Sequence, residues 1–523
     1  MPFAARRANP SKNEEWLIKK WKARGNGRPY NIARSRDLPA GGRPLSAPTD
    51  SGGCRLKRIY RMRNNTTLNM TEGKPLVLLS VFALPLLIGN LFQQAYNLAD
   101  SMIVGRLLGA NALAAVGATG SISFLFFSIF NGISGGCGIV VAQFFGARKD
   151  QMVCKAIANS AYLTLAASVL TGAVAFLMVP TVLSWMGTPE EILPDAITYM
   201  RMTTASVPLV AIYNYASSMQ RALGDSRTPL YFLVLSCLIN VGLDLLFVGS
   251  FGLGVFGAAL ATMLSQLLAG AGSLLYAFRR NPYFRVSRSA RAFDPQIARS
   301  AIRLGLPLAL QWSLIAISTT ALQSVVNSFG ATAMAAYTAV NRLEQLVQQP
   351  FGSMGMALST YAGQNHGAGE TRRIQRGLRD GLMAMITLAC LMTLIMQMWG
   401  EGFVGLFVQE REVIQMGGKA LKITSLFYVF LGVIYVTRGV LNGVGDAFFS
   451  FVNGVVEIAG RVGLPFLLLH FTSAGVWSIW ITAGVTWLLA GSSCVIRYLS
   501  WKRKQDRRTA GQELTAQRPV LDT

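Results

Sequence analysis

Long apolar runs recur along the chain and are separated by short polar segments. Each run has about 20 or more residues, which is long enough to cross the hydrocarbon core of a bilayer. The runs fall at 75–104, 111–143, 153–180, 193–219, 227–250, 254–278, 297–328, 332–365, 374–399, 413–440, 447–469 and 473–499. This pattern predicts an all-α integral membrane protein with twelve transmembrane helices in two sets of six.

Three short motifs recur at a constant offset of 221 residues. LGANALAAV at 108–116 matches FGATAMAAY at 329–337, AQFFGA at 142–147 matches GQNHGA at 363–368, and RALGD at 221–225 matches NGVGD at 442–446. Because six is an even number of helices, both copies enter the membrane from the same side. The sequence therefore predicts two six-helix lobes related by a parallel internal repeat, with substrate sites at or inside the lobes.

The composition agrees with a membrane protein and argues against a nucleic-acid binder. The 523 residues carry a formal charge of +24, yet only 14% are charged and 52% are apolar. A soluble basic protein needs more charged residues to cover its surface. We therefore expect no nucleic-acid partner, and we expect membrane lipids around a chain that works as a monomer.

The positive charge is concentrated in a few segments, which predicts how the chain is oriented. Residues 1–74 hold 17 basic and 5 acidic residues, and residues 279–303 hold seven and one. The predicted inner loops add further basic residues, among them Arg148, Arg221 and Arg438. The positive-inside rule then predicts a multi-pass protein of the cell (plasma or inner) membrane with both termini in the cytoplasm.

The same boundaries divide the chain into five parts. Residues 1–74 are rich in Arg, Lys, Pro and Gly and predict a disordered cytoplasmic extension. An N-lobe at 75–278, a basic cytoplasmic linker at 279–303 and a C-lobe at 304–500 follow, and 501–523 form a basic cytoplasmic tail. The six cysteines and two histidines have no metal-ligand spacing, so we expect no metal site apart from a possible sodium ion at the residues described next.

Two carboxylates within apolar spans of the N-lobe are the first functional candidates, because an ionisable group at membrane depth is unfavourable unless it is paired or hydrated. Asp100 lies in the first span and Asp244 in the fifth. Asn240 precedes Asp244 by four residues and shares its helix face. At about 1.5 Å per residue, Asp100, Asp244 and Thr262 lie at similar depths. Such a cluster suits a proton or a hard monovalent cation.

Several of these motifs together resemble the multidrug and toxic compound extrusion (MATE) family. They are LPLLIGNLFQQAYNLADSMIVGRLLGANALAAVG, RALGDSRTP, NVGLD and GAALAT, and the similarity covers about 75–500. The resemblance implies two six-helix bundles that export organic cations and drugs in exchange for H+ or Na+. It also implies that Asp100, Asn240, Asp244 and Thr262 form a cation-coupling site and that the first helix bends at Pro85.

The C-lobe departs from part of that family, because its first helix reads LPLALQWSLIAIS and lacks a carboxylate. Coupling through the N-lobe is therefore favoured. Other charges are present: Glu457 and Arg461 are four residues apart and are predicted to pair along one helix face. The role of Glu344 is left open: it could contact the substrate, or it could pair with Arg342 or Arg461.

The favoured function is a secondary active antiporter that exports small, cationic organic molecules, with H+ or Na+ as coupling ion and no other cofactor. The chain has no GxxxxGK[ST] phosphate-binding loop, and we find no clustered motif of a membrane enzyme. Two alternatives remain: a lipid-linked oligosaccharide flippase of the wider superfamily, whose cavity is often cationic, and a membrane-anchored adaptor that uses its basic tail.

Overall fold

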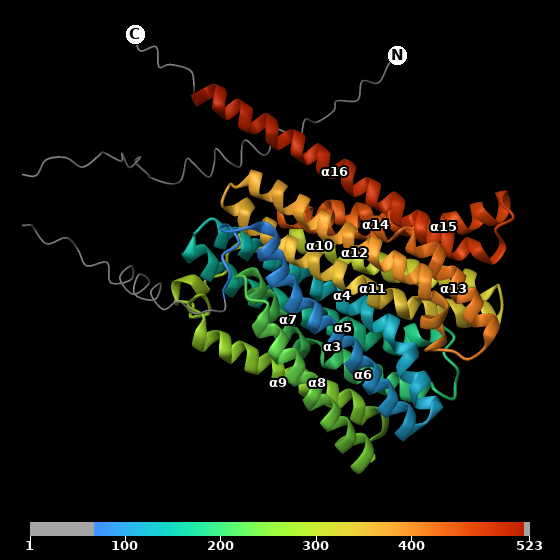
Figure 1. Ribbon diagram of the computed structural model, residues 1–523. Helices are drawn as coiled ribbons and strands as arrows, with labels where there is room; N and C mark the ends of the chain where they lie inside the picture. Colours follow the sequence, from blue (N-terminus) through green and yellow to red (C-terminus); the bar gives the residue numbers. More distant parts are fainter. Residues whose placement is uncertain (1–66, 517–523) are drawn as a thin grey trace, which may run out of the picture. The chain divides into compact units, whose positions relative to one another are not determined.

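The computed structural model describes residues 67–516, which contain helices and no strand. The first set of six helical positions ends before the basic linker (Figure 1). It comprises α3 (Pro75–Leu108), α4 (Ala110–Gly146), α5 (Asp150–Trp185), the pair α6 (Leu193–Ala205) and α7 (Val207–Ala222), α8 (Arg227–Asp244) with its π-helical extension η1 (Leu245–Ser250), and α9 (Gly254–Arg280).

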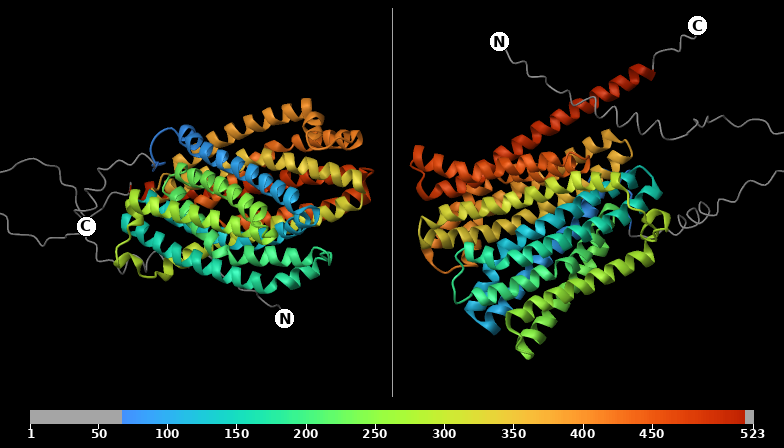
Figure 2. Two further views of the ribbon diagram at one scale, coloured as in Figure 1. Left: turned by 90° about the horizontal axis from the view of Figure 1, so that it is seen from below. Right: turned by 180° about the vertical axis from the view of Figure 1, so that it is seen from behind.

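The second set repeats this order after two short 3-10 turns, η2 (Pro282–Phe284) and η3 (Ser289–Arg291). It comprises α10 (Pro295–Asn327), α11 (Ala331–Gly367), α12 (Thr371–Gly405), the pair α13 (Arg411–Ser425) and α14 (Tyr428–Gly443), α15 (Phe448–Phe471), the turn η4 (Gly475–Trp477) and α16 (Ser478–Ala516). The last helix continues without a break into the segment predicted as a tail, and it extends beyond the other helices in Figure 2.

Nine of the described helical spans are long and apolar enough to cross a membrane, and the bent pair α13–α14 adds a tenth. The two remaining positions are α6–α7 and α11. Polar side chains of α11, including Asn341, Glu344 and Gln348, line a cavity, which explains why this helix is less apolar than its neighbours. All twelve predicted positions are therefore helical within the described residues, and the predicted fold is confirmed.

The internal repeat is visible in the backbone. Gly109 before α4 and Gly330 before α11 have φ angles of +88° and +86°, and they are 221 residues apart. Gly224 and Gly445, which precede the fifth helix of each set, have φ angles of +87° and +93°. Side-chain-bearing residues rarely adopt such angles, so the same turns are built at equivalent places in both halves. The parallel repeat is confirmed.

Helix α3 packs against both lobes. Leu79, Phe82 and Leu86 in its first half belong to a hydrophobic cluster formed mainly by helices of the C-lobe. Farther along, Gly89 lies against Leu230 and Leu233 of α8 in the N-lobe. Helix α10 mirrors this arrangement: Gly132 and Gly136 of α4 lie against its first half, and Arg461 of α15 bonds to Ser318 in its second half. The first helix of each set therefore connects the two lobes.

The lobes are held together at the end of the bundle where α4 joins α5 and α11 joins α12, which we call the basic end. There the side chain of Gln143 donates a hydrogen bond to the carbonyl of Gly443 at 2.9 Å, and Gln364 donates to the carbonyl of Ala222 at 3.1 Å. Gly146 and Gly367 lie against the backbones of Gln364 and Gln143. At the opposite part of α4, an added Cβ at Gly117 or Gly120 would meet nothing within 4 Å. The lobes therefore close at the basic end.

Residues 68–70 cross this closed end, although the sequence assigns them to a disordered extension. The side chain of Met70 is fully buried. Its N–H donates to Gln364 at 2.9 Å, and its carbonyl accepts hydrogen bonds from Asn365 and Arg373. The N–H of Leu68 donates to the carbonyl of Gly224 in the N-lobe at 3.3 Å. The prediction for 1–74 is wrong for this short stretch, because side chains of the C-lobe and the Gly224 carbonyl of the N-lobe bind it. Residues 1–66 lie outside the described part of the chain.

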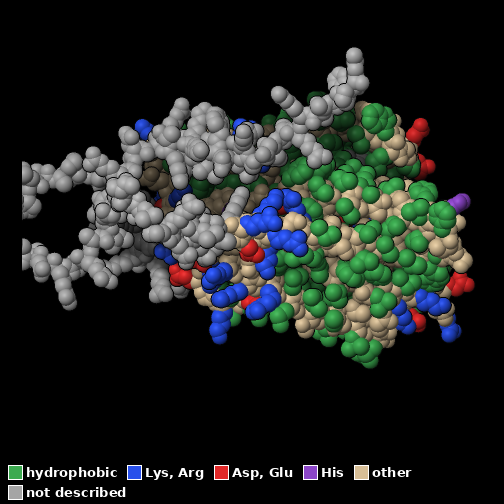
Figure 3. Space-filling model, turned by 90° about the horizontal axis from the view of Figure 1, so that it is seen from above, with side chains coloured by type: hydrophobic (Ala, Val, Ile, Leu, Met, Phe, Trp, Pro, Cys, Tyr) green, Lys and Arg blue, Asp and Glu red, His purple; other side chains and the backbone are tan. Residues whose placement is uncertain are grey.

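The predicted basic linker packs against the N-lobe. Asp294 accepts a 2.7 Å hydrogen bond from Lys155 of α5 and caps the start of α10 by accepting from the N–H groups of Gln296 and Ile297. These bonds hold the pKa of the Asp294 carboxyl below its usual range. Most of the Lys and Arg side chains visible in Figure 3 gather toward the basic end of a largely apolar surface.

Candidate functional site

The four predicted coupling residues meet inside the N-lobe. Asp100 comes from α3, Asn240 and Asp244 from α8, and Thr262 from α9. The side chains of Asn240 and Asp244 are 1% and 0% exposed. The carboxyl groups of Asp100 and Asp244 are in hydrogen-bond contact. The predicted convergence is therefore present, although it does not by itself assign a role to these residues.

Asn240 orients the carboxyl of Asp244. The positions of its amide oxygen and nitrogen are assigned from the neighbouring groups: the nitrogen faces the carboxylate and the oxygen faces Thr262. In this orientation the nitrogen donates to Asp244 Oδ2 at 2.8 Å, and the oxygen accepts from the N–H and the hydroxyl of Thr262 at 3.1 and 3.3 Å. The i, i+4 spacing on α8 explains why the two side chains point the same way.

Two tyrosines complete this site and were missed by the sequence analysis. The Tyr96 hydroxyl lies 3.3 Å from the Thr262 hydroxyl. Tyr96 precedes Asp100 by four residues, a spacing that could have identified it. Tyr199 of α6 lies near both carboxyl groups, and nothing in the local sequence indicates this. Phenol groups therefore surround the carboxyl pair.

The pair is suited to hold one proton or one monovalent cation. Oδ1 of Asp100 and Oδ1 of Asp244 are buried without a hydrogen-bond partner among the described residues. No described Lys or Arg forms an ion pair with either residue. Two adjacent carboxyl groups in an apolar cavity cannot both be ionised without a large free-energy penalty. A proton shared between them, or a cation bound to both, removes that repulsion.

Pro85 lies where α3 passes from one lobe to the other. It sits between Leu79 and Phe82, which pack into the C-lobe cluster, and Gly89, which contacts α8. Proline has no N–H to bond to the carbonyl four residues earlier, so the helix is locally easier to bend. Helix α3 is continuous through this residue. The bend implied by the resemblance stays a prediction.

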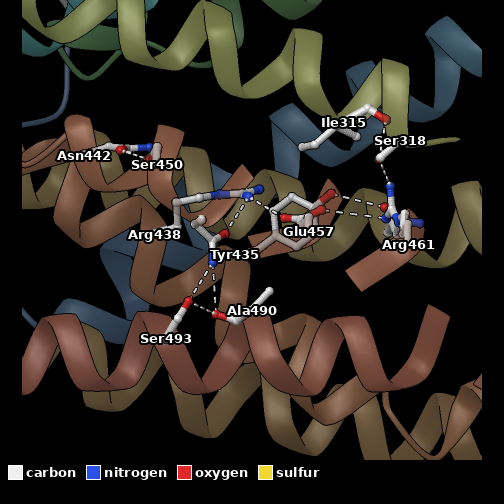
Figure 4. A network of polar contacts seen from close by, with 12 residues as sticks. Ile315, Ser318, Tyr435, Arg438, Asn442, Ser450, Glu457, Arg461, Ala490 and Ser493 are labelled. Carbon is white, nitrogen blue, oxygen red and sulfur yellow. Dashed lines mark hydrogen bonds and ion pairs between the residues drawn. The ribbon is translucent and has the colours of Figure 1, made fainter. Parts of the chain in front are cut away.

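The C-lobe contains a buried network of charges (Figure 4). Glu457 of α15 pairs with Arg461 at 3.7 Å, as the i, i+4 spacing predicts, and also with Arg438 of α14 at 3.3 Å. Arg461 also donates to the Ser318 hydroxyl of α10 at 2.9 Å. Arg438 was assigned to an inner loop by the charge pattern, whereas its side chain is only 8% exposed. One carboxylate therefore neutralises one of two guanidinium charges.

Glu344 forms no ion pair with Arg342 or Arg461 among the described residues. Its Oε1 is buried without a partner, beside the hydroxyl groups of Thr424 and Tyr428. It lines a cavity of about 630 Å³ that is formed mainly by C-lobe helices, which we call the C-lobe cavity. The sequence left two roles open for Glu344, a substrate contact or a partner for an arginine. The described residues do not contain the second.

A second cavity of about 600 Å³ lies between the two lobes, and we call it the central cavity. Its lining includes Arg221 and Asn214 from α7, Phe124 from α4, and Trp312 and Arg438 from the C-lobe. Gln345, Gln348 and Phe124 also line the C-lobe cavity, so the two cavities adjoin. The coupling residues do not line the central cavity, and the link between the two places is α3, which carries Asp100 and contributes Asn90 to the lining.

Two repeated helical lobes around a central cavity are typical of a polytopic membrane transporter. The MatE family model matches residues 85–246 and 307–461. The chain therefore belongs to the multidrug and toxic compound extrusion family.

Relatives and solved structures agree with this assignment. The chain is 30% identical to the probable multidrug resistance protein YpnP of Bacillus subtilis over 83% of its own length and 97% of that protein. It is 29% identical to the probable multidrug resistance protein YoeA of the same organism, over 82% and 94% of the two chains. A crystal structure of MATE in the bent conformation has a TM-score of 0.78 at 23% identity, covering 86% of this chain and 98% of that one, which supports the fold.

Proposed function

We propose that this protein is a secondary active antiporter that exports drugs and other small organic molecules in exchange for H+ or Na+. The contact between Asp100 and Asp244 carries the proposal, because it offers one exchangeable cation site inside a transporter fold. The names of the two Bacillus relatives describe multidrug resistance and support export of drugs. Membership in a transporter family fits the expectation that the chain is not an enzyme.

The packing of α3 supports a route from ion binding to movement of the lobes. Asp100 lies in the part of α3 that packs on the N-lobe, and Leu79 and Phe82 lie in the part that packs on the C-lobe. Neutralising the carboxyl pair changes the forces on one end of this helix. A bend near Pro85 would then alter the contact at the other end, and alternating access follows from that change.

The charge distribution supports a cytoplasmic location for the basic end. Arg148, Arg372 and Arg376 lie near it, whereas Glu190, Glu401 and Glu410 lie near the opposite end. The positive-inside rule then orients the closed end toward the cytoplasm of a plasma or inner membrane, with both termini on that side. The central cavity would accordingly be closed to the cytoplasm in this conformation. Monomeric function among membrane lipids stays a prediction from the sequence.

The N-lobe acids support a cationic substrate less strongly than the sequence suggested. Asp100 and Asp244 contact each other and do not line the central cavity. The same cavity has two arginines in its lining, which is the one observation that favours the lipid-linked oligosaccharide flippase as a second candidate. The family match favours the antiporter.

The test is transport by the full chain in everted membrane vesicles. Uptake of fluorescent organic dyes is measured with a pH gradient and a sodium gradient imposed separately. One gradient should drive uptake and the other should not, because one site binds one coupling ion at a time. Dye movement that ignores both gradients contradicts the proposal. An Asp506→Asn variant, altered at an exposed acid of α16 in the C-terminal segment, is the matched control.

A further inference from the structure

The central cavity is lined by basic and neutral side chains. Its lining includes Arg221 and Arg438 and contains no Asp or Glu. The only carboxylate in ion-pair contact with either arginine among the described residues is Glu457, which Arg438 shares with Arg461. The side chains that face a bound molecule therefore present positive charge, opposite to the acids of the N-lobe.

Arg221 contributes an uncompensated charge. It lies in the last turn of α7 and is partly buried. Its guanidinium makes no hydrogen bond or ion pair with another described residue, and the phenol of Tyr213 is the one group that acts on its charge. A guanidinium removed from water without a carboxylate loses solvation energy that no protein group restores. An anion in the cavity would restore it through paired N–H donors.

Arg438 is held in a fixed position on the other lobe. It pairs with Glu457 at 3.3 Å, and its guanidinium lies 5.1 Å from the centre of the Tyr435 ring. The Tyr435 hydroxyl in turn donates to Gln348, another lining residue. Arg221 and Arg438 belong to different lobes and line the same cavity, so a molecule bound there lies between a basic group of each half.

The rest of the lining suits an aromatic organic molecule. The rings of Phe124 in the N-lobe and Trp312 in the C-lobe lie edge to face, 6.3 Å apart, and both are more than one-third exposed. Side-chain amides of Asn214, Gln345 and Gln348 supply neutral hydrogen-bond donors. Amides and arginines donate to carboxylate, sulfonate or phosphate oxygens.

We propose that the central cavity selects aromatic organic anions, with Arg221 and Arg438 as the groups that bind the anionic end. The inference rests on the proposed transport function, since it names the substrate class of that transporter. It replaces the cationic class expected from the sequence. Phe124 and Trp312 bind the aromatic part of the same molecule.

Equilibrium binding to the purified full chain in detergent, without any ion gradient, tests this assignment. The probes are two xanthene dyes of similar size, the anionic 5-carboxyfluorescein and the cationic rhodamine 6G, and the readout is fluorescence anisotropy. The wild-type chain should bind carboxyfluorescein about tenfold more tightly than rhodamine 6G. Arg221→Gln should weaken carboxyfluorescein binding about tenfold, because a hydrogen-bonded charge pair is lost. Arg221→Lys should retain most of the affinity.

Arg299→Gln is the matched control, because it removes the same charge from an exposed position of α10 outside the cavity. It should bind both dyes like the wild type. Each variant is compared by size-exclusion chromatography, so that misfolded protein is recognised. Tighter binding of rhodamine 6G, no binding of either dye by folded protein, or equal loss in Arg221→Gln and Arg299→Gln would overturn the inference.

Competition with a polyprenyl phosphate in the same detergent separates two sources of the anion. Displacement of carboxyfluorescein by the lipid at lower concentration than by a soluble aromatic carboxylate assigns a lipid-linked anion; the reverse order assigns a free one. Both results uphold the anionic class. Because binding is measured without a gradient, failure of ion coupling at Asp100 and Asp244 would leave this result unchanged and would appear only in the vesicle assay.

Discussion

Gln143 of α4 donates a hydrogen bond to the carbonyl of Gly443 of α14, and the same relationship occurs a second time in the molecule. Adding 221 to the number of Gln143 gives Gln364, which donates to the carbonyl of Ala222, and Ala222 is the repeat counterpart of Gly443. Each lobe therefore donates one glutamine hydrogen bond to the other lobe and accepts one from it. This reciprocal pair forms across the closed end because two similar halves face each other around a common axis.

Removing both glutamines is expected to loosen the closed end. The two hydrogen bonds that join the lobes, at about 1 kcal/mol each, correspond to a change of roughly 30-fold in an open–closed equilibrium. Spin labels at the exposed positions Arg227 and Arg372, one on each lobe, measure the separation by pulsed electron resonance. The Gln143→Ala, Gln364→Ala double variant should add a population at longer distance. Gln296→Ala, at an exposed position, is the control, and an unchanged distribution would contradict the prediction.

The carboxyl pair is expected to be essential for export. Asp100→Asn and Asp244→Asn each retain the shape of the side chain but remove the charge that exchanges a cation, so each should abolish drug resistance in expressing cells. Membrane protein levels are measured by immunoblot alongside the inhibitory drug concentrations. Asp506→Asn, at an exposed position of α16, should behave like the wild type. Normal resistance in both carboxyl variants would refute coupling at this site.

Glu457 is expected to be important for stability. Glu457→Gln leaves Arg438 and Arg461 buried without a carboxylate, a change that destabilises proteins by about 3–5 kcal/mol. The thermal unfolding midpoint in detergent should fall markedly, whereas the exposed Glu410→Gln should have little effect. Combining Glu457→Gln with Arg461→Met removes one uncompensated charge and should recover part of the loss. A double variant less stable than the single one would contradict this explanation.

Asp294 should make stability depend on pH in a defined direction. Its bond to Lys155 lowers the pKa of the carboxyl, so the stabilisation is present above the pKa of the unfolded chain, about 4, and is lost as the pH falls below it. Asp294→Asn should therefore be less stable than the wild type at pH 7, and the difference should shrink toward pH 3. Asp294→Ala also removes the helix cap, which is worth about 1 kcal/mol. Thermal unfolding of each variant at both pH values measures these effects. A difference that grows on acidification would contradict the assignment.

The sequence predicted those parts of the molecule that depend on local pattern. Apolar length predicts a membrane helix because backbone groups in lipid must be satisfied within the segment, and the offset of 221 between motifs predicts the repeat. Asn240 and Asp244 could be placed together because the i, i+4 spacing fixes a common helix face. The pairing of Glu457 with Arg461 follows from the same rule.

Other features depend on which helices pack together, and local pattern does not contain that information. Arg221 and Arg438 near helix ends look like topology signals in sequence, since the pattern is the same whether an arginine faces the cytoplasm or a cavity. Tyr199 reaches the carboxyl pair only because α6 packs against α9, which carries Thr262, and Met70 is buried only because both lobes meet around it. The sequence by itself determined the helices, their repeat and the acids within them. Only the tertiary structure decided which charges face the central cavity, because that depends on contacts between residues far apart in the chain.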